Sequence, residues 1–252
     1  MLSDLASIDY SRNITTNLYN EPFADQAFFL EAVKLVREKL PKAIIWTNSN
    51  GDYLTPGLLQ KVALAGLNKL KVTVHPPKGR PFEPSRENRA LELFLKKIGM
   101  PDTDNSSVAS SREVCGRIGD FYLVVQIIDW QQEGNSRGGA ANKVGNVLVE
   151  RSYPCVKPFR EFTVFHDLSV TQCCDAFYDP RTWTQNKLFK ASDFENIFDA
   201  YCSDALTKIR QGLFAHGKKC GICSQCLVHD YSIDDSEARR FLRGQLLLGL
   251  RS

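Results

Sequence analysis

Three cysteines with two residues between each, Cys220, Cys223 and Cys226, constrain this chain more than any other feature of its sequence. The other five of its eight cysteines are Cys115, Cys155, Cys173, Cys174 and Cys202. The first residues show no basic segment followed by an apolar one, so we expect no secretory signal and a cytoplasmic location. A disulfide framework is not expected there, and clustered short spacings indicate a metal or iron–sulfur site instead.

A single tight loop can bring thiolates at this spacing onto one metal centre, and Gly221 lets the loop turn without a steric penalty. Zinc and a [4Fe–4S] cluster both use about four ligands, so further donors must come from elsewhere. Neighbouring residues of a strand point to opposite faces, so we expect only one of the adjacent pair Cys173 and Cys174 to bind, and the sequence does not say which. The candidate metal ligands, enough for one cluster but not two, are Cys155, Cys173, Cys174, Cys220, Cys223 and Cys226.

Two alternatives stay open for these cysteines. A cysteine can be a small buried hydrophobic residue, which is the interpretation we favour for Cys115 and Cys202. The metal can also be structural zinc with no redox role, because thiolates bind zinc and iron–sulfur clusters alike.

The first hundred residues alternate between strand and helix patterns. β-branched and apolar runs predict strands, and apolar residues at helical spacing predict helices. The expected strands are 13–19, 43–47 and 69–75, and the expected helices are 28–40, 55–65 and 86–98. A polar stretch, 99–119, which we interpret as a linker or loop, precedes a long apolar strand, 121–130. This order predicts an α/β fold with βαβ units and a parallel sheet.

The composition changes at about residue 147, where most of the cysteines and shorter elements begin. The expected elements there are a strand at 162–165 and helices at 194–214 and 234–250. We therefore expect two domains, 1–146 and a smaller α+β domain at 147–252.

The length and net charge of the chain exclude some classes of protein function. The chain has 252 residues, enough for one large domain or two modest ones. Its formal net charge is +3, from 32 Lys and Arg against 29 Asp and Glu, which is too small to indicate nucleic-acid or membrane binding. No apolar run approaches the ~20 residues of a membrane span. We expect neither nucleic acid nor membrane as a partner.

Polar residues follow the predicted strands. Glu21 comes after the first strand, Asn48 and Asn50 after the second, and His75 closes the third. The carboxyl ends of parallel strands commonly carry function, so these four are candidate ligand-binding residues. The alternatives are a solvated loop carboxylate for Glu21, ordinary turn residues for the two asparagines, and a hydrogen-bonded histidine.

Several segments, in their order, resemble the radical S-adenosylmethionine (radical SAM) superfamily with a C-terminal SPASM/twitch iron–sulfur domain. They are Tyr19–Pro22, Thr47–Leu54, Val72–His75, Pro154–Phe159, Phe162–Asp167, Cys173–Asp175 and the pair Cys220 and Cys223. The resemblance implies a partial (β/α) barrel of the radical SAM type, followed by a small cysteine-rich α+β SPASM/twitch domain with one auxiliary [4Fe–4S] cluster.

The same resemblance implies that Glu21 holds the amino group of SAM and that Asn48, Asn50 and His75 face this cofactor. It implies 5′-deoxyadenosyl radical chemistry on a peptide or small-molecule substrate, with an electron-donor protein as a possible partner. The family's Cys-x3-Cys-x2-Cys motif has no match, because residues 1–114 contain no cysteine. We therefore expect a chain that lacks the family's first strand and N-terminal cysteine segment and is inactive alone. The alternatives are a non-catalytic iron–sulfur module for electron relay or docking, and a structural zinc-binding protein.

Overall fold

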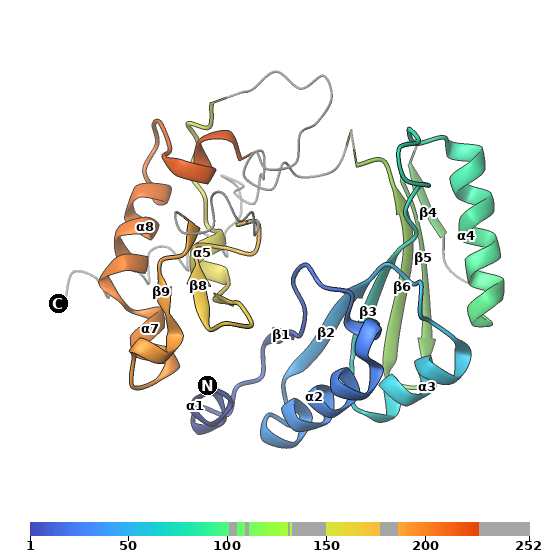
Figure 1. Cartoon of the computed structure of the whole chain (residues 1–252), viewed down its shortest axis with the longest axis horizontal. Coiled ribbons are helices and arrows are strands. Elements are labelled where there is room, and N and C mark those ends of the chain that lie inside the picture. The colour runs from blue at the N-terminus through green and yellow to red at the C-terminus, as the bar shows by residue number, and fades with distance from the viewer. Residues whose placement is uncertain (101–104, 109–110, 131, 133–149, 177–185, 227–252) are drawn as a thin grey trace. The chain divides into compact units, whose positions relative to one another are not determined.

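The computed structural model describes residues 1–100, 105–108, 111–130, 132, 150–176 and 186–226 (Figure 1). The chain divides into two compact units, Met1–Gly134 and Asn135–Ser252. The domain boundary that we predicted, at residues 146 and 147, lies outside the described residues. So do the predicted helix at 234–250 and the end of the chain.

The first unit is built on one mixed sheet with the strand order β1-β2-β3-β6-β5-β4. Its strands are β1 (Asn13–Thr15), β2 (Ile44–Ser49), β3 (Lys69–Thr73), β4 (Asn105–Val108), β5 (Ser111–Ile118) and β6 (Phe121–Ile128). β1, β2, β3 and β6 are parallel, whereas β5 pairs antiparallel with β6, and β4 with β5. The predicted α/β fold with a parallel sheet is therefore confirmed.

The polar stretch 99–119 was predicted wrongly as a linker, since most of it forms β4 and β5. β5 turns directly into β6 through Gly119, whose φ of +60° suits glycine. Only Val114 within β5 is fully buried, at 0% exposure. β5 lacks the alternation of apolar and polar residues by which strands are recognised in a sequence. It forms a strand because it pairs with β6.

Apart from α1, the helices of the first unit begin where a side chain caps them. They are α1 (Leu2–Ser7), the short 3₁₀ helix η1 (Pro22–Asp25), α2 (Gln26–Lys39), α3 (Pro56–Leu64) and α4 (Pro84–Ile98). Thr55 accepts a hydrogen bond from the Leu58 amide, and Pro56 opens α3 within one residue of its predicted start. α4 begins before the predicted Arg86, because the Glu83 carboxylate accepts bonds from the amides at its start.

The core of the first unit lies between the sheet and helices α2, α3 and α4. Its fully buried side chains come from all these elements and include Phe23, Val33, Ile45, Val62, Leu70, Val72, Leu91 and Val125. α2 contacts β2, and α4 contacts β6, so these helices pack on the sheet (Figure 1).

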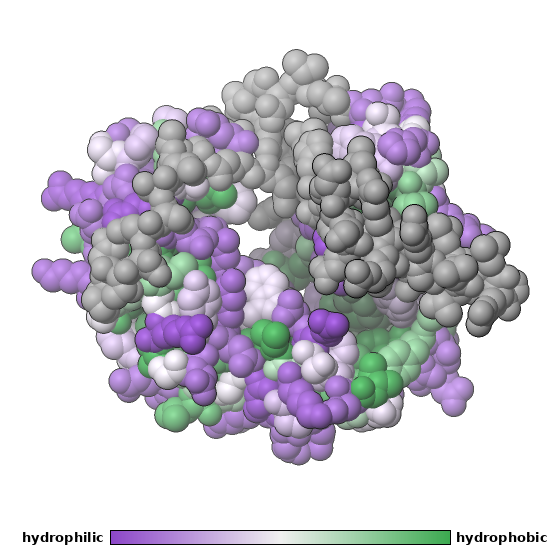
Figure 2. Space-filling model, turned by 180° about the vertical axis from the view of Figure 1, so that it is seen from behind, coloured by the Kyte–Doolittle hydropathy of each residue, from purple (hydrophilic) through white to green (hydrophobic). Residues whose placement is uncertain are grey.

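Some large apolar side chains of these helices point outward. Phe28, Leu64 and Leu93 are 71%, 88% and 61% exposed on α2, α3 and α4. Figure 2 shows apolar surface interspersed with hydrophilic surface on one face of the protein. Exposed apolar residues that are scattered singly are normal on soluble proteins and indicate no docking surface.

The second unit has a three-stranded antiparallel sheet and several short helices. Its described elements are α5 (Lys157–Arg160), β7 (Thr163–Val164), β8 (Ser169–Thr171), β9 (Phe189–Lys190), η3 (Ala191–Asp193), α7 (Ile197–Tyr201), α8 (Asp204–Phe214) and η4 (Gly221–Gln225). The predicted helix 194–214 is two helices, because Ser203 caps a new start at Asp204. Arg210 of α8 donates to the Pro158 carbonyl at 3.0 Å and so joins α8 to α5.

No helix in the described part of the chain is long and apolar enough to cross a membrane.

Candidate functional site

The loops after the parallel strands β1, β2, β3 and β6 meet at one edge of the first unit's sheet. Parallel strands end on the same side, so polar residues that follow different strands come together there. Glu21, Asn48, Asn50 and His75 all lie in these strand ends or loops.

Glu21 fixes the loop after β2. Its Oε1 accepts hydrogen bonds from the Ser49 hydroxyl at 2.8 Å and from the Phe23 amide at 3.1 Å. Its Oε2 accepts one from the Asn50 amide at 2.8 Å. The half-buried carboxylate therefore has three donors within the chain. It ties η1 to the end of β2, and the structure brings Glu21 and Asn50 into direct contact.

Asn17 makes a second link between the ends of β1 and β2. Its side-chain oxygen accepts from the Thr47 hydroxyl at 2.8 Å and from the Asn48 amide at 3.1 Å. Its amide nitrogen donates to the Asn48 carbonyl at 3.1 Å. The Asn48 side chain itself is exposed. The sequence prediction missed Asn17, because an asparagine in a loop carries no local sign of a partner thirty residues away.

Gly51 is required by the same loop. Its φ is +81°, and an added Cβ would lie 2.7 Å from the Phe94 ring and 2.9 Å from the Val72 side chain. The Asn50 side chain accepts from the Asp52 amide at 2.9 Å, a local turn typical of asparagine. The loop therefore holds one conformation close to Glu21.

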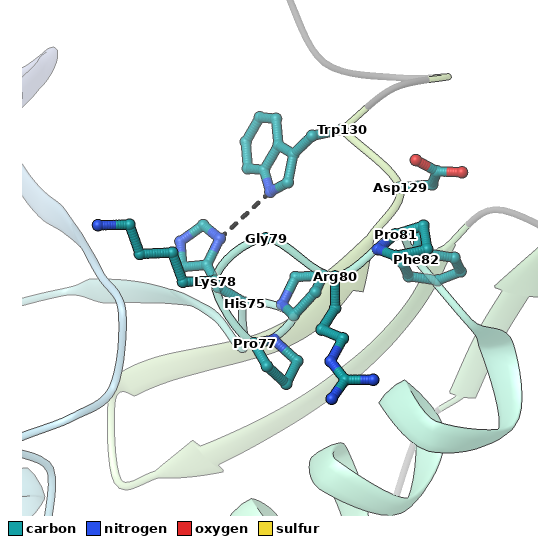
Figure 3. A pocket seen from close by; sticks show the side chains of 10 residues that line it. His75, Pro77, Lys78, Gly79, Arg80, Pro81, Phe82, Asp129 and Trp130 are labelled. Carbon is teal, nitrogen blue, oxygen red and sulfur yellow. Dashed lines mark hydrogen bonds between the residues drawn. The ribbon is translucent and has the colours of Figure 1, made fainter. Parts of the chain in front are cut away.

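His75 stacks on a tryptophan at the end of β6. The His75 and Trp130 rings lie 5.9 Å apart with an interplanar angle of 23°. The Trp130 indole nitrogen donates to His75 Nδ1 at 3.3 Å (Figure 3). Trp130 was part of the predicted apolar strand and was not among the predicted site residues.

A cavity of about 260 Å³ opens beside this pair. It is lined by the segment from His75 to Phe82, by Asp129 and by Trp130 (Figure 3). Lys78 and Arg80 are the cations of its lining, and Asp129 is 8% exposed and accepts from the Gln132 side chain at 3.1 Å. Its volume suits one ring-sized group or part of a larger ligand.

Apart from Cys202, the cysteines of the second unit lie on three segments, around Cys155, around Cys173 and in the loop of η4, and hydrogen bonds link the loop of η4 to the other two. The Arg151 amide donates to the Ser224 carbonyl at 2.7 Å, which joins the segment before Cys155 to the loop of η4. The Gln172 side chain reaches the Cys223 sulfur at 4.0 Å, which places the end of β8 beside that loop.

The thiols that these segments carry influence one another. Burial, followed by the charges of Cys226 and Cys155, raises the pKa of Cys223 to about 11. Cys155 and Cys226 are themselves buried, whereas Cys220 is exposed. Even so, no group of three His, Cys, Asp or Glu side chains among the described residues is arranged to hold a metal ion.

Cys173 and Cys174 lie in the bend and turn after β8 rather than in a strand, so the strand argument for them was wrong. Cys173 is buried, which raises its pKa. The Cys174 sulfur accepts from Lys157 Nζ at 3.4 Å, and its amide donates to Glu161 at 2.8 Å. Burial and the Glu161 carboxylate raise the pKa of Cys174 to about 12 against the opposing charge of Lys157.

The two cysteines that we expected to be small buried hydrophobic residues differ from that expectation. Cys202 is exposed, because it ends α7 at its C-cap. Cys115 is half-buried in β5. Its sulfur lies 3.7 Å from the Glu113 carboxylate on the same strand.

Known proteins are similar to this chain in sequence and in structure. The chain is 26% identical over 192 residues to the S-adenosyl-L-methionine-dependent 2-deoxy-scyllo-inosamine dehydrogenase of Niallia circulans, a match that covers 75% of this chain and 72% of the dehydrogenase. The crystal structure of BtrN in complex with AdoMet and 2-DOIA has a TM-score of 0.60 at 18% identity and covers 94% of this chain and 81% of BtrN. This likeness shows the fold. Selenomethionine BtrN in an open conformation has a TM-score of 0.55 at 19% identity, over 90% of this chain and 76% of that one. No protein-family model matches the sequence.

These similar proteins contradict the resemblance to a SPASM/twitch protein. One is named as a SAM-dependent dehydrogenase and the others as BtrN, and none of these names supports a SPASM/twitch domain. The assignment to a SPASM/twitch protein without its N-terminal cysteine segment is therefore wrong. The SPASM/twitch part of the resemblance depended most on the cysteine-rich second half, and short cysteine spacings of this kind recur in unrelated metal sites.

Proposed function

We propose that this chain is a SAM-dependent oxidoreductase that dehydrogenates a small hydroxylated substrate. The similarity to a SAM-dependent dehydrogenase over 75% of the chain supports the reaction class. The likeness to a fold that was solved with AdoMet and 2-DOIA supports a small ligand beside SAM. The observation that carries the proposal is the Glu21 carboxylate at the strand-end edge, where it holds the β2–α3 loop.

Glu21 retains capacity for a cationic ligand. A carboxylate offers about four acceptor positions, and the described contacts of Glu21 use three of them. The remaining position and the negative charge suit the amino group of SAM. Asn48 and Asn50 flank this position on the same loop, and their side chains have the polar atoms to bind the rest of the methionine.

The His75 and Trp130 pair suits the flat part of the ligand. Aromatic rings that are partly exposed bind a further ring by offset stacking. The cavity beside them is large enough for a ring-sized group but smaller than a typical drug-sized site of roughly 300–1,000 Å³. We assign it to one ring of SAM or of the substrate.

We also propose that the second unit binds one iron–sulfur cluster, which when bound supplies one-electron transfer. Thiols are the type of donor that such a cluster uses, and here they lie on hydrogen-bonded segments, although no three of them among the described residues are arranged to hold a metal ion. The charges of Cys226 and Cys155 both contribute to the raised pKa of Cys223, and Cys220 lies at the start of the same loop as Cys223. With Cys173 these are five candidates for about four ligand positions, and we prefer Cys173 over Cys174, because Cys174 is already held by Lys157 and Glu161.

Product analysis tests the reaction. Loss of two hydrogen atoms turns a secondary alcohol into a ketone. With SAM as the oxidant, one hydrogen ends on 5′-deoxyadenosine, the other leaves as a proton, and methionine is released. The chain, reconstituted anaerobically with iron and sulfide, is incubated with dithionite, SAM and 2-deoxy-scyllo-inosamine, and the products are measured by mass spectrometry.

We expect ketone and 5′-deoxyadenosine in equal amounts. Both should fall on Glu21→Gln and persist on Glu31→Gln, the same change at an exposed position of α2. The proposed reaction would be contradicted if neither product rose above its level in a control without protein.

A further inference from the structure

One face of the first unit's sheet carries polar and charged side chains. Successive residues of a strand point to opposite faces. In β3, Leu70 is buried in the core, whereas Lys71 and Thr73 are half-buried. In β5, Val114 is the buried core residue, and its neighbour Glu113 is half-buried. Lys71, Thr73 and Glu113 therefore point to the face of the sheet that is turned away from the core.

The register of the strands brings four polar side chains of this face together. Thr73 of β3 is paired with Gln126 of β6, and Gln126 is paired with Glu113 of β5. Gln126 Nε2 donates to the Thr73 hydroxyl at 2.9 Å, and the Lys71 ammonium lies 3.5 Å from the Glu113 carboxylate. The Lys71 and Glu113 side chains are 34% and 38% exposed. These four residues, which we call the polar row, span three strands and are accessible to a ligand.

The polar row borders the candidate site at the strand ends. Lys71 is paired with Asn48 of β2, which is one of the candidate ligand-binding residues. Thr73 is the last residue of β3 and lies two residues before His75, whose ring stacks at the strand ends. A ligand that is bound at the strand ends can therefore extend onto the polar row.

The ion pair in the row is loose enough to admit a ligand. Its separation of 3.5 Å exceeds the roughly 2.7–3.2 Å of an ordinary hydrogen bond from nitrogen to oxygen. The Lys71 ammonium has three donors, and the Glu113 carboxylate has about four acceptor positions. The Gln126 side chain adds a carbonyl oxygen to the nitrogen that it uses towards Thr73. The row therefore offers donors and acceptors side by side.

This arrangement suits neighbouring hydroxyl groups on one molecule. A hydroxyl group both donates and accepts, so an ammonium beside a carboxylate satisfies both of its functions. The adjacent amide of Gln126 can do the same for a second hydroxyl group. An alcohol with a single hydroxyl group would cover the remaining polar atoms without replacing their hydrogen bonds to water, which costs free energy. The row therefore favours a ligand with several hydroxyl groups.

We propose that Lys71, Glu113 and Gln126 bind adjacent hydroxyl groups of the substrate, and that this substrate is a ring compound with several hydroxyl groups rather than a simple alcohol. The inference rests on the proposed dehydrogenase function. The neighbouring cavity of about 260 Å³ has room for one ring. The three residues select the alcohol that is oxidised and take no part in the transfer of hydrogen.

Equilibrium binding to the full chain tests the polar row without turnover. The protein is prepared as for the product assay but without dithionite, and SAM is present throughout. Titration calorimetry then measures the binding of 2-deoxy-scyllo-inosamine and of cyclohexanol. The wild type should bind 2-deoxy-scyllo-inosamine at least tenfold more tightly than cyclohexanol. Glu113→Gln and Lys71→Met should each weaken this binding about tenfold, because each removes a charge-assisted hydrogen bond.

Glu92→Gln is the matched control. Glu92 of α4 lies 3.6 Å from Arg112, so this variant breaks an ion pair of the neighbouring β5 residue on the helix side of the sheet. It should leave the affinity for 2-deoxy-scyllo-inosamine unchanged. If Lys71→Met does not fold, Lys71→Gln removes the charge and keeps a polar side chain. Equal affinities of the Glu113 and Glu92 variants, equal affinities of the wild type for the two ligands, or no binding to the wild type would overturn the inference.

Product analysis separates this inference from the proposed function. If 2-deoxy-scyllo-inosamine binds through the polar row but yields neither ketone nor 5′-deoxyadenosine, the reaction is contradicted and the row stands. If ketone forms with the same KM in Glu113→Gln and Glu92→Gln, the reaction stands and the row is overturned.

Discussion

At the scale of single residues, the strand-end site depends on backbone positions as much as on charged side chains. Glu21 holds the β2–α3 loop through the Asn50 amide and the Ser49 hydroxyl. Gly51 N donates to the same Ser49 hydroxyl oxygen at 2.9 Å. The loop therefore reaches its conformation only if residue 51 tolerates a positive φ and close contact with the side chains behind it.

Gly51→Ala should destabilise the first unit. The new Cβ would stand 2.7 Å from Phe94 and would be strained at a φ of +81°, at a cost of about 1–3 kcal/mol in the free energy of unfolding. Gly57→Ala is the matched control, because a Cβ there meets nothing within 4 Å and the residue lies in α3. Urea unfolding should show a loss for Gly51→Ala and no loss for Gly57→Ala, and equal stabilities would refute the requirement for glycine.

At the scale of elements, local signals predicted the helices better than the sheet. Thr55 and Pro56 mark the start of α3, and Gly66, just beyond its end, has a positive φ that suits glycine. These signals act within a few residues, so the sequence displays them. β5 has no such signal, because its identity comes from pairing with β6.

The site residues also divide into those with a local sequence signal and those that depend on a distant partner. Glu21, Asn48, Asn50 and His75 were identified because polar residues after strands can be recognised one at a time, and their roles in binding stay predictions. Asn17 and Trp130 were missed, because each acts through a partner that is distant in sequence. Partners of this kind become visible only when the sheet brings the strand ends together.

The start of α4 should weaken in acid. Hydrogen bonds from the Ser85 hydroxyl and from the amides of Arg86 and Ser85 lower the pKa of Glu83 below its ordinary value of 4.5. A carboxyl group with a lowered pKa stabilises the fold above 4.5 and loses that effect as the pH falls through its folded pKa.

Hydrogen exchange of the first turn of α4 tests this effect. Exchange, corrected for the intrinsic pH dependence, should speed up as the pH falls below 4.5 in the wild type, and Glu83→Gln should lack most of this pH dependence. Glu92→Gln, an exposed position on the same helix, is the control. A pH dependence that survives Glu83→Gln would contradict the capping role.

At the scale of the whole molecule, the two units differ in what holds them together. The first unit has one large core that includes residues from β2, β3, β6 and three helices. Among the described residues, the core cluster of the second unit is small, and its buried members are Val170, Ala191 and Leu206 at 0%, 9% and 2% exposure. A unit with so little buried apolar surface gains much of its stability from a metal centre when it binds one.

Removal of the metal should therefore affect the second unit selectively. In reconstituted protein, a chelator or exposure to oxygen should raise hydrogen exchange in residues 150–176 and 186–226 and leave residues 1–100 unchanged. Serine at Cys223 should have the same effect without chelator, and serine at the exposed Cys202 should not. Unchanged exchange in the second unit after loss of iron would mean that its fold does not depend on the cluster.

Equilibrium binding of SAM tests the central claim most directly, because it needs neither the substrate nor turnover. Titration calorimetry under anaerobic conditions should detect SAM binding to the wild type, and Glu21→Gln should weaken it about tenfold, which corresponds to about 1.4 kcal/mol. Glu31→Gln should bind SAM as the wild type does. Absence of binding to the wild type, or equal affinity in the Glu21 and Glu31 variants, would contradict a SAM site at the strand ends of the first unit.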